Sequence, residues 1–459
     1  MHFHQRLLRG VLSSLASRGL SVASQLITIP VLARGWGVQT YGEYLTILAV
    51  AGFVSLATLG MHPAVLSEMS MAHSREDSRR YGDLLRGFFQ LVLVISLGCV
   101  VALGIAALMP AWLGLAAASH GRAYPLGQTL LFLGLQQVAA QNFGVFTNGI
   151  AALGRYGEAG LFDTVRAGID SLALWAAVLL LHWTPNLTAM VSSGLTFAFV
   201  ILAWLRLRSL NDEARHLFRR ADWGSLLNLW RAVVGNFAMT TGYNALLIQG
   251  PRLILAGVSG PTSVATFAIV WALLGIFRQA FEVVLHPLAV EFSYAFGAGQ
   301  RDRAELLLSV GTSSAAAISL LAGPVLLVLG PWMVSVATKG QLHPSLPLMG
   351  IMWGVLLAYA STMAFHTALL ASNQSHATLF KFALWSAGAS ALTIALAYAA
   401  GLLGVAGGLL IFQLGFSAIV VHATVQVFGL DSARLVRRIF SWETPLMLLQ
   451  LARGASGRA

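Results

Sequence analysis

Residues 91–105 read LVLVISLGCVVALGI, a run of apolar and small residues that contains no charge. The run lies inside a longer apolar window at 87–109, which is enough for a helix to cross a hydrocarbon layer about 30 Å thick. Windows of this kind recur along the whole chain. The stretch therefore predicts a transmembrane helix, and its recurrence predicts an all-α membrane protein with many spans.

The composition of the 459 residues agrees with this prediction. Hydrophobic residues make up 57% and charged residues 10% of the chain, whereas soluble domains carry about 25% charged residues. So few charges cannot cover a soluble surface. The composition therefore excludes a disordered chain, a collagen-like fibre, a disulfide-framework secreted module and a nucleic-acid-binding domain. Cys99 is the single cysteine, which excludes an intrachain disulfide and any multi-cysteine metal site.

Apolar windows of about 20 residues predict twelve helices. They lie at 11–33, 43–63, 87–109, 126–150, 158–181, 187–205, 232–256, 263–290, 305–330, 346–371, 379–400 and 404–428. The basic start of the chain resembles a signal peptide, but Arg18 interrupts the apolar stretch, and we interpret it as a retained first span. The connections are too short for a separate soluble domain.

The basic residues predict the orientation of the spans. Of the 28 Lys and Arg residues, 21 fall on one side when both termini are placed in the cytoplasm, and only Arg34, Arg122 and Lys339 fall on the other. Short cytoplasmic loops carry an excess of Lys and Arg. The net charge of +11 is therefore explained by topology, and no nucleic-acid partner is needed.

The two halves of the sequence resemble one another at an offset near 222. The segment 79–85 (RRYGDLL) matches 301–307 (RDRAELL), and His62-Pro63 recurs as His286-Pro287. Six spans in each half give the halves the same orientation, which is typical of transporters with parallel repeats and a substrate site between them. We predict an N-terminal lobe at 1–205, a cytoplasmic linker at 206–231, a C-terminal lobe at 232–430 and a basic cytoplasmic tail at 431–459.

Several charged residues fall inside predicted spans. They are the arginines Arg18, Arg166, Arg252 and Arg278 and the acids Asp163, Asp170 and Glu282. Such residues are costly in a membrane and usually face a cavity or a partner. Asp163, Arg166 and Asp170 share one helix face by their spacing, as do Arg278 and Glu282.

These arginines support two interpretations. Arginine suits phosphate because its planar fork donates parallel hydrogen bonds and keeps its charge, so the residues could line a vestibule for an anionic substrate. Alternatively, Asp163–Arg166 and Arg278–Glu282 form ion pairs within their own helices. Arg252 lies near a span end, where its side chain could extend to the interface. The acids are candidate coupling groups or charge partners.

Amides follow one face of the predicted helix at 126–150. The candidates for sugar contacts are Gln137, Gln141 and Asn148. The same amides could instead form hydrogen bonds between helices, and the sequence does not separate the two alternatives.

Catalytic and nucleotide-binding motifs are absent from the sequence. Neither Lys339 nor Lys381 is followed by Ser or Thr as a P-loop requires, and H-E-x-x-H and G-x-S-x-G do not occur. We therefore expect no ATP binding, no metal, no cofactor and no enzymatic activity. Transport would draw its energy from an ion gradient, the substrate's own gradient or another protein.

One stretch carries a family resemblance. Residues 30–44, PVLARGWGVQTYGEY, resemble the first-loop signature of the Wzx-type polysaccharide flippases, roughly P-x-L-A-R-x-L-G-P-E-x-Y/F-G-x-Y. A degenerate copy lies at 251–267, and the segments 79–85 and 301–307 resemble cytoplasmic loops of the family. The resemblance extends over about residues 10–430.

The resemblance implies the fold of the multidrug/oligosaccharidyl-lipid/polysaccharide exporter (MOP) superfamily, with two six-helix lobes around a central cavity. It implies export of undecaprenyl-pyrophosphate-linked oligosaccharide units across a bacterial inner membrane by alternating access, for surface polysaccharide synthesis. Arg18, Arg278, Arg166 and Arg252 would then contact the pyrophosphate. The implied partners are the lipid-linked oligosaccharide, membrane lipids, a polysaccharide polymerase and a chain-length regulator.

Two other functions remain open from the sequence. A cation-coupled exporter of drugs or other small molecules would show the same repeat and topology, although four intramembrane arginines against three acids favour an anionic substrate. A membrane polymerase or ligase acting on lipid-linked sugars is the second alternative. Such enzymes generally need a large outer loop, and the longest outer loops here have about 16 residues.

Overall fold

The computed structural model describes residues 19–439 except 21, 59, 109–124, 225–229, 298–299 and 373. All regular secondary structure in these residues is helical, so the prediction of an all-α chain is confirmed. The chain divides into two compact units, one formed by Ala23–Ala268 and a second formed around Ile269–Ala459. The division falls inside helix α11. The predicted lobe boundary at 206–231 stays a prediction.

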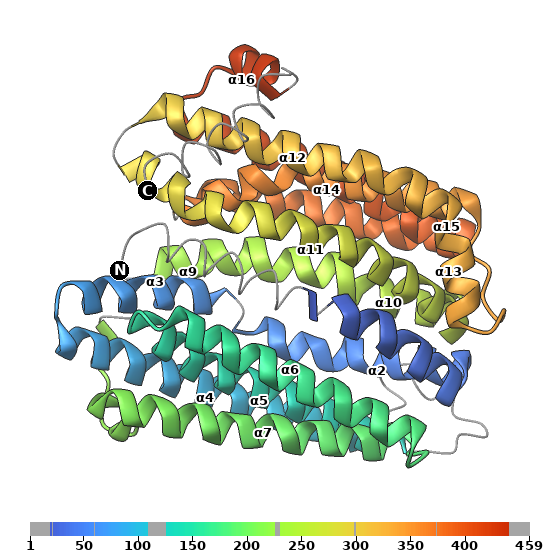
Figure 1. The fold of residues 1–459 in the computed structure, drawn as a ribbon, viewed down its shortest axis with the longest axis horizontal. Helices are drawn as coiled ribbons and strands as arrows, with labels where there is room; N and C mark the ends of the chain where they lie inside the picture. The colour runs from blue at the N-terminus through green and yellow to red at the C-terminus, as the bar shows by residue number, and fades with distance from the viewer. Residues whose placement is uncertain are drawn as a thin grey trace, which may run out of the picture. The chain divides into compact units, whose positions relative to one another are not determined.

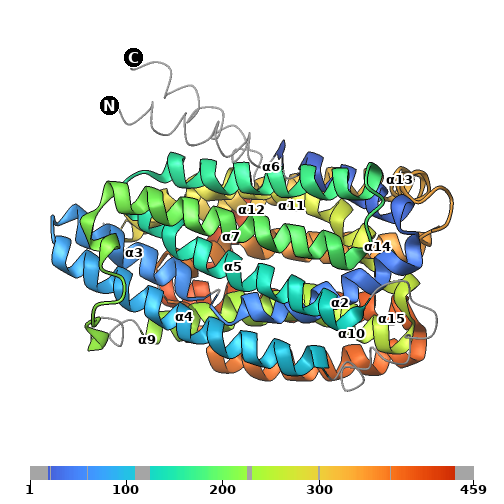
Figure 2. The same ribbon diagram turned by 90° about the horizontal axis from the view of Figure 1, so that it is seen from below.

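The first unit begins with the helix Val22–Gly35. It continues with α2 (Val38–Leu56), α3 (Met61–Ser74), α4 (Ser78–Leu108), α5 (Leu126–Ala152), α6 (Tyr156–Leu179), α7 (Pro185–Leu210), the 3-10 turn η3 (Asp212–Arg215), α9 (Trp230–Asn236), the π-helices η4 (Phe237–Gly242) and η5 (Ala245–Gln249), and α10 (Gly250–Val258). Helix α5 is central, because it contacts α2, α3, α4, α6 and α7. Figures 1 and 2 show α5, α6 and α7 side by side within this unit.

The second unit contains most of α11 (Pro261–Gly297). It continues with α12 (Arg301–Val328), α13 (Gly330–Ala337), α14 (Leu346–Ala371), the 3-10 turn η6 (Ser375–Thr378), α15 (Leu379–Phe428) and α16 (Ser432–Ile439). Helix α14 packs against both α12 and α15 (Figure 1). Helix α15 is two helices joined at a kink, because Ala400 and Gly401 have non-helical backbone angles. The kink separates the predicted spans 379–400 and 404–428.

Seven helices in the described residues are long and apolar enough to cross a membrane. They coincide with eight of the twelve predicted spans, because α15 contains two. The other four spans are helical but differ in length or polarity. Helix α6 carries four charges, α5 is rich in amides, 232–256 is interrupted by π-helices, and the span 11–33 is described only from its second half.

The signature stretch 30–44 ends the first helix and begins α2. Gly37 lies between them with φ 84°, a left-handed conformation that glycine adopts without the strain of a Cβ. Gly42 lies against the start of α11, since a Cβ at this position would be 2.0 Å from the main-chain oxygen of Pro261. The two glycines thus permit a tight turn and a close backbone contact.

The first part of the predicted linker packs against the helices of the first unit. Ala214 and Leu217 are buried in the hydrophobic core around α4, α5 and α7. Gln90 on α4 donates from Nε2 to the main-chain oxygens of Leu217 (2.9 Å) and Arg219 (2.6 Å). The segment after α7 is therefore part of the bundle rather than a free connection.

Candidate functional site

The predicted site residues lie on four helices. Helix α5 carries Gln137, Gln141 and Asn148, helix α6 carries Asp163, Arg166 and Asp170, helix α10 carries Arg252, and helix α11 carries Arg278 and Glu282. Arg18 lies outside the described residues. The α5, α6 and α10 residues belong to the first unit, and the α11 residues belong to the second.

Arg278 lies between two aromatic rings. Its guanidinium carbon is 4.9 Å from the ring centroid of Trp271 and 4.8 Å from that of Tyr359. Trp271 is on the same helix, two turns earlier, whereas Tyr359 comes from α14. Both distances fall within the range of a cation–π interaction. The contacts tie a charged side chain on α11 to the neighbouring helix.

Arg166 has a similar contact in the first unit. Its guanidinium carbon lies 5.1 Å from the ring centroid of Phe143 on α5. Asp163 and Asp170 lie three residues before and four residues after it on α6. In a helix these spacings put the three residues on one face.

Asp170 belongs to a polar cluster that joins three helices. It accepts a hydrogen bond from the hydroxyl of Ser192 on α7 and one from Nε2 of Gln136 on α5 (3.3 Å). Gln136 also donates to the Ser192 hydroxyl (2.7 Å). The carboxylate therefore has specific partners inside the helical bundle, as buried charged groups require.

A ladder of polar contacts joins the helix Val22–Gly35 to α6. The hydroxyls of Ser24 and Ser171 are 2.6 Å apart, and Trp175 donates from its indole to Thr28 Oγ1 (2.9 Å). Just beyond both helices, the Trp36 indole donates to a main-chain oxygen at residue 183 (2.9 Å). Each pair is separated by 147 residues, so the two segments run parallel and in register. Asp170 directly precedes Ser171, which makes the first of these contacts.

The amides of α5 bond mainly to neighbouring helices. Gln141 is buried, and its Nε2 donates to the main-chain oxygen of Val54 at the end of α2. Asn148 Nδ2 lies 2.9 Å from Nδ1 of His62 on α3. Gln137 is half-buried. These contacts hold helices together, and the predicted sugar contacts of the three amides stay a prediction.

Arg252 and Glu282 are the remaining predicted site residues in the described part of the chain. Arg252 is half-buried on α10, which packs against α2, and Tyr41 on α2 is buried. Glu282 is half-buried one turn after Arg278 on α11. Among the described site residues, Arg166 and Arg278 thus lie over aromatic rings.

The aromatic partners were missed in the sequence analysis. Trp271 could have been found, because a spacing of seven residues puts it on the same face of α11 as Arg278. Phe143 and Tyr359 come from other helices, and no local pattern connects them to an arginine. Their roles depend on tertiary packing alone.

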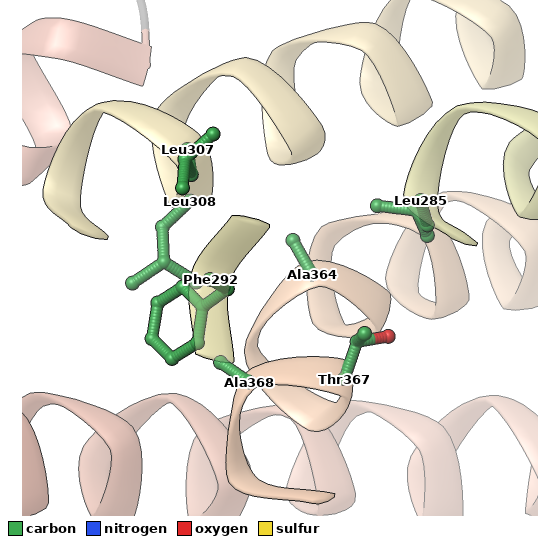
Figure 3. A pocket seen from close by; sticks show the side chains of 7 residues that line it. All are labelled: Leu285, Phe292, Leu307, Leu308, Ala364, Thr367 and Ala368. Carbon is green, nitrogen blue, oxygen red and sulfur yellow. The ribbon is translucent and has the colours of Figure 1, made fainter. Parts of the chain in front are cut away.

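A small apolar pocket lies in the second unit between α11, α12 and α14. Its walls are Leu285, Phe292, Leu307, Leu308, Ala364, Thr367 and Ala368, and Figure 3 shows these side chains around it. No predicted site residue is among them. The pocket is therefore separate from the charged residues described above.

Solved structures with the same fold are transporters. An inward-facing MATE-family multidrug resistance transporter of the MOP superfamily matches with TM-score 0.66 and 12% identity, covering 93% of this chain and 98% of that chain. An outward-facing MATE transporter matches with TM-score 0.68 and 12% identity, covering 92% and 95%. A MOP-superfamily transporter from Pyrococcus furiosus matches with TM-score 0.59 and 11% identity, covering 93% and 97%.

No family model and no curated protein matches the sequence. The structural likeness nevertheless extends over nearly the whole length of both chains. The protein therefore has the fold of the MATE transporters of the MOP superfamily, as a polytopic helical membrane protein. The predicted fold class is confirmed.

Proposed function

We propose that this protein is a transporter that moves an undecaprenyl-pyrophosphate-linked oligosaccharide across the bacterial inner membrane by alternating access. The observation that carries the proposal is the setting of the intramembrane arginines. Arg166 and Arg278 lie over aromatic rings, and Arg252 lies on α10, which packs against α2.

Charged side chains in a membrane-spanning helix cost about 2.5–3.5 kcal/mol on insertion scales. A chain that retains such charges and surrounds them with aromatic rings stabilises cations, since a ring face attracts a guanidinium without removing its charge. Cations kept in this way suit an anionic group that enters the protein. A pyrophosphate is such a group, and arginine binds it through two parallel hydrogen bonds.

The fold supports transport, because the structures with which it is shared are transporters. The transporter from Pyrococcus furiosus is described as having a binding pocket of reverse polarity that suggests a different function. This supports the idea that one fold serves substrates of opposite charge. The lipid-linked sugar follows from the resemblance of residues 30–44 to the flippase signature.

The acids take a second role in this proposal. Asp170 accepts hydrogen bonds from Ser192 and Gln136, and Asp163 and Glu282 lie near arginines along the chain. We propose these three acids as charge partners or coupling groups, while Gln137, Gln141 and Asn148 remain the candidates for sugar contacts. Arg18 is proposed as a further pyrophosphate ligand on its sequence position alone.

A cation-coupled multidrug exporter is the second candidate function, favoured by the MATE-family multidrug transporters that share the fold. Such an exporter binds cationic drugs and would be expected to present acidic groups to them. A polymerase or ligase is less well supported, because the matched structures are transporters. The two transport functions differ in the charge of the substrate, and this difference can be measured.

The test uses full-length protein in liposomes of bacterial lipids. One set contains a fluorescent undecaprenyl-pyrophosphate oligosaccharide, and a second set contains ethidium as a cationic drug, with a proton or sodium gradient in each. We expect protein-dependent appearance of the lipid-linked sugar in the opposite leaflet and no ethidium movement. Ethidium movement without sugar movement would establish the multidrug alternative.

A further inference from the structure

The aromatic rings around Arg278 form a clamp built from two helices. We use the name aromatic clamp for Trp271 on α11 and Tyr359 on α14. Both side chains are buried, with exposed fractions of 7% and 4%. Since their ring centroids lie 4.9 and 4.8 Å from the guanidinium carbon, each ring is close enough to interact with the charge of Arg278.

The clamp is itself held in place by packing. Tyr359 stacks on Phe281 of α11 with ring centroids 6.3 Å apart and an interplanar angle of 28°. Phe281 is fully buried and lies three residues after Arg278. Helix α11 therefore supplies the arginine, one ring of the clamp and the support for the other ring. A side chain enclosed in this way has few rotamers available.

Two rings at this distance restrict the positions that the guanidinium of Arg278 can take, and the N–H donors of a guanidinium lie in its plane. A phosphate is bound at the edge of this plane, where two donors match two oxygens. Cation–π contacts also favour the charged side chain in surroundings of low dielectric constant, where they are stronger than in water. The aromatic clamp thus restricts the orientation of the Arg278 guanidinium and stabilises its charge.

The first unit offers an internal comparison. Arg166 has one ring, Phe143, and its own helix carries Asp163 and Asp170 within four residues of it. Arg278 has two rings from two helices. The ring contacts therefore constrain Arg278 more than Arg166, and the effect of removing a ring is expected to be larger at Arg278.

We propose that Trp271 and Tyr359 are positioning residues that hold the charged edge of Arg278 toward the pyrophosphate of the substrate. They would set the affinity for the anion rather than the rate of the conformational cycle. This inference rests on the proposed function, because it presumes a phosphate-containing substrate. It assigns to α14 a part in substrate binding that the sequence did not indicate.

The experiment measures KM and kcat for the fluorescent lipid-linked pyrophosphate in liposomes, with full-length protein. Tyr359→Phe keeps the ring and should leave KM within twofold of wild type. Tyr359→Leu and Trp271→Leu should each raise KM about tenfold, equivalent to about 1.4 kcal/mol, with kcat within twofold. The double variant Arg278→Gln with Tyr359→Leu should be no worse than Arg278→Gln alone, because the ring acts through the arginine.

Phe412→Leu is the matched control. Phe412 is buried in the same unit and stacks on Phe416 with ring centroids 6.2 Å apart, so the substitution removes a buried ring of α15 from another aromatic pair. It should lower the unfolding temperature without changing KM. If Tyr359→Leu fails to reach the membrane, Trp271→Leu and the Tyr359→Phe comparison still test the clamp.

The outcomes separate the two proposals. Wild-type protein that moves no lipid-linked pyrophosphate overturns the proposed function and the clamp together. Active wild-type protein in which both leucine variants behave like Phe412→Leu overturns the clamp alone. A KM that rises in Glu282→Gln but not in the ring variants also overturns it, since Arg278 would then be positioned by the acid.

Discussion

In each compact unit, ion pairs attach a segment that follows the last long helix to the start of an earlier helix. The earlier helix supplies an arginine to this segment in the first unit and an acid in the second. In the first unit, Arg86 on α4 contacts Asp83 (2.7 Å) and Glu213 of η3 (2.5 Å). In the second unit, Glu305 on α12 contacts Arg434 (3.6 Å) and Arg438 (3.5 Å) of α16. We call these the α4 clasp and the α12 clasp. In the α4 clasp, η3 after α7 contacts the start of α4. In the α12 clasp, α16 after α15 contacts the start of α12.

The clasps occupy matching places in the sequence repeat. Asp83 and Glu305 are separated by the repeat offset of 222 residues, and both lie in the matching segments 79–85 and 301–307. Each returning segment also buries a leucine, Leu217 in the first unit and Leu435 in the second, both 3% exposed. The repeat preserves the attachment, the acid at the start of the long helix and the buried leucine, whereas the returning segment supplies an acid, Glu213, in the first unit and arginines, Arg434 and Arg438, in the second.

The second predicted span of each repeat has a different helical structure in the two units. In the first repeat α2 ends at Leu56 and α3 begins at Met61, whereas the counterpart α11 is one helix from Pro261 to Gly297. Side chains bind the main-chain oxygens near the end of α2: Gln141 donates to Val54, and Thr241 donates to Leu56 (3.1 Å). These hydrogen bonds tie the end of α2 to α5 and to η4.

The largest effect is expected at the junction between α2 and α3. A Cβ at Gly60 would lie 2.2 Å from the Cα of Phe237, and backbone at this distance cannot move aside as a flexible side chain can. Gly60→Ala should therefore destabilise the protein by about 3 kcal/mol or more. The measurement is the unfolding free energy in detergent.

Gly98→Ala is the control for this prediction, since an added Cβ at Gly98 on α4 meets no atom within 4 Å. It should be neutral or slightly stabilising, because alanine favours a helix over glycine. Equal effects of the two substitutions would mean that the junction between α2 and α3 is not packed against η4, and the contrast with α11 would lose its physical basis.

Much of the fold could be predicted from the sequence because apolar windows map directly onto helices. The window 126–150 became α5 at Leu126–Ala152, and 346–371 became α14 at Leu346–Ala371. The junction between α2 and α3 and the π-helices η4 and η5 could not be predicted. Both depend on partners far away in the sequence, such as Gln141 for Val54, and local periodicity contains no information about them.

The candidate site was only partly accessible from the sequence. The spacing of Asp163, Arg166 and Asp170 predicted a common face on one helix, and the structure places all three on α6. The second interaction partner of Arg278, Tyr359, lies on α14, and contacts between helices leave no spacing pattern. Whether these residues bind the substrate stays a prediction.

The next largest loss of stability is expected at the α4 clasp, in which one arginine contacts two acids. Arg86 is 12% exposed, and its partners Asp83 and Glu213 are 19% and 32% exposed. Arg86→Leu leaves two partly buried carboxylates without their cation, so we expect a loss of about 2 kcal/mol, less than for a fully buried pair. The exposed pair Arg80–Glu68 (3.0 Å) is the control, and Arg80→Leu should cost below about 1 kcal/mol. Equal losses in detergent unfolding would contradict a structural role for the α4 clasp.

The smallest effect is expected at the α12 clasp, where the acid is central and the arginines are exposed. Glu305 is 5% exposed, whereas Arg434 and Arg438 are 51% and 33% exposed. Glu305→Gln removes the buried charge but keeps an acceptor of similar shape, and the arginines left behind can be solvated. The expected loss is about 1 kcal/mol, and the sensitive measurement is the rate of proteolysis within α16.

Asp302→Asn separates the buried acid from its exposed neighbour. Asp302 also contacts Arg434 (3.1 Å), but it is 82% exposed, so its pair is screened by water and should contribute little. We therefore expect faster cleavage of α16 in Glu305→Gln and wild-type cleavage in Asp302→Asn. If both variants release α16 equally, the attachment depends on general surface charge. The correspondence between Glu305 and Asp83 would then be a feature of the sequence without a shared structural role.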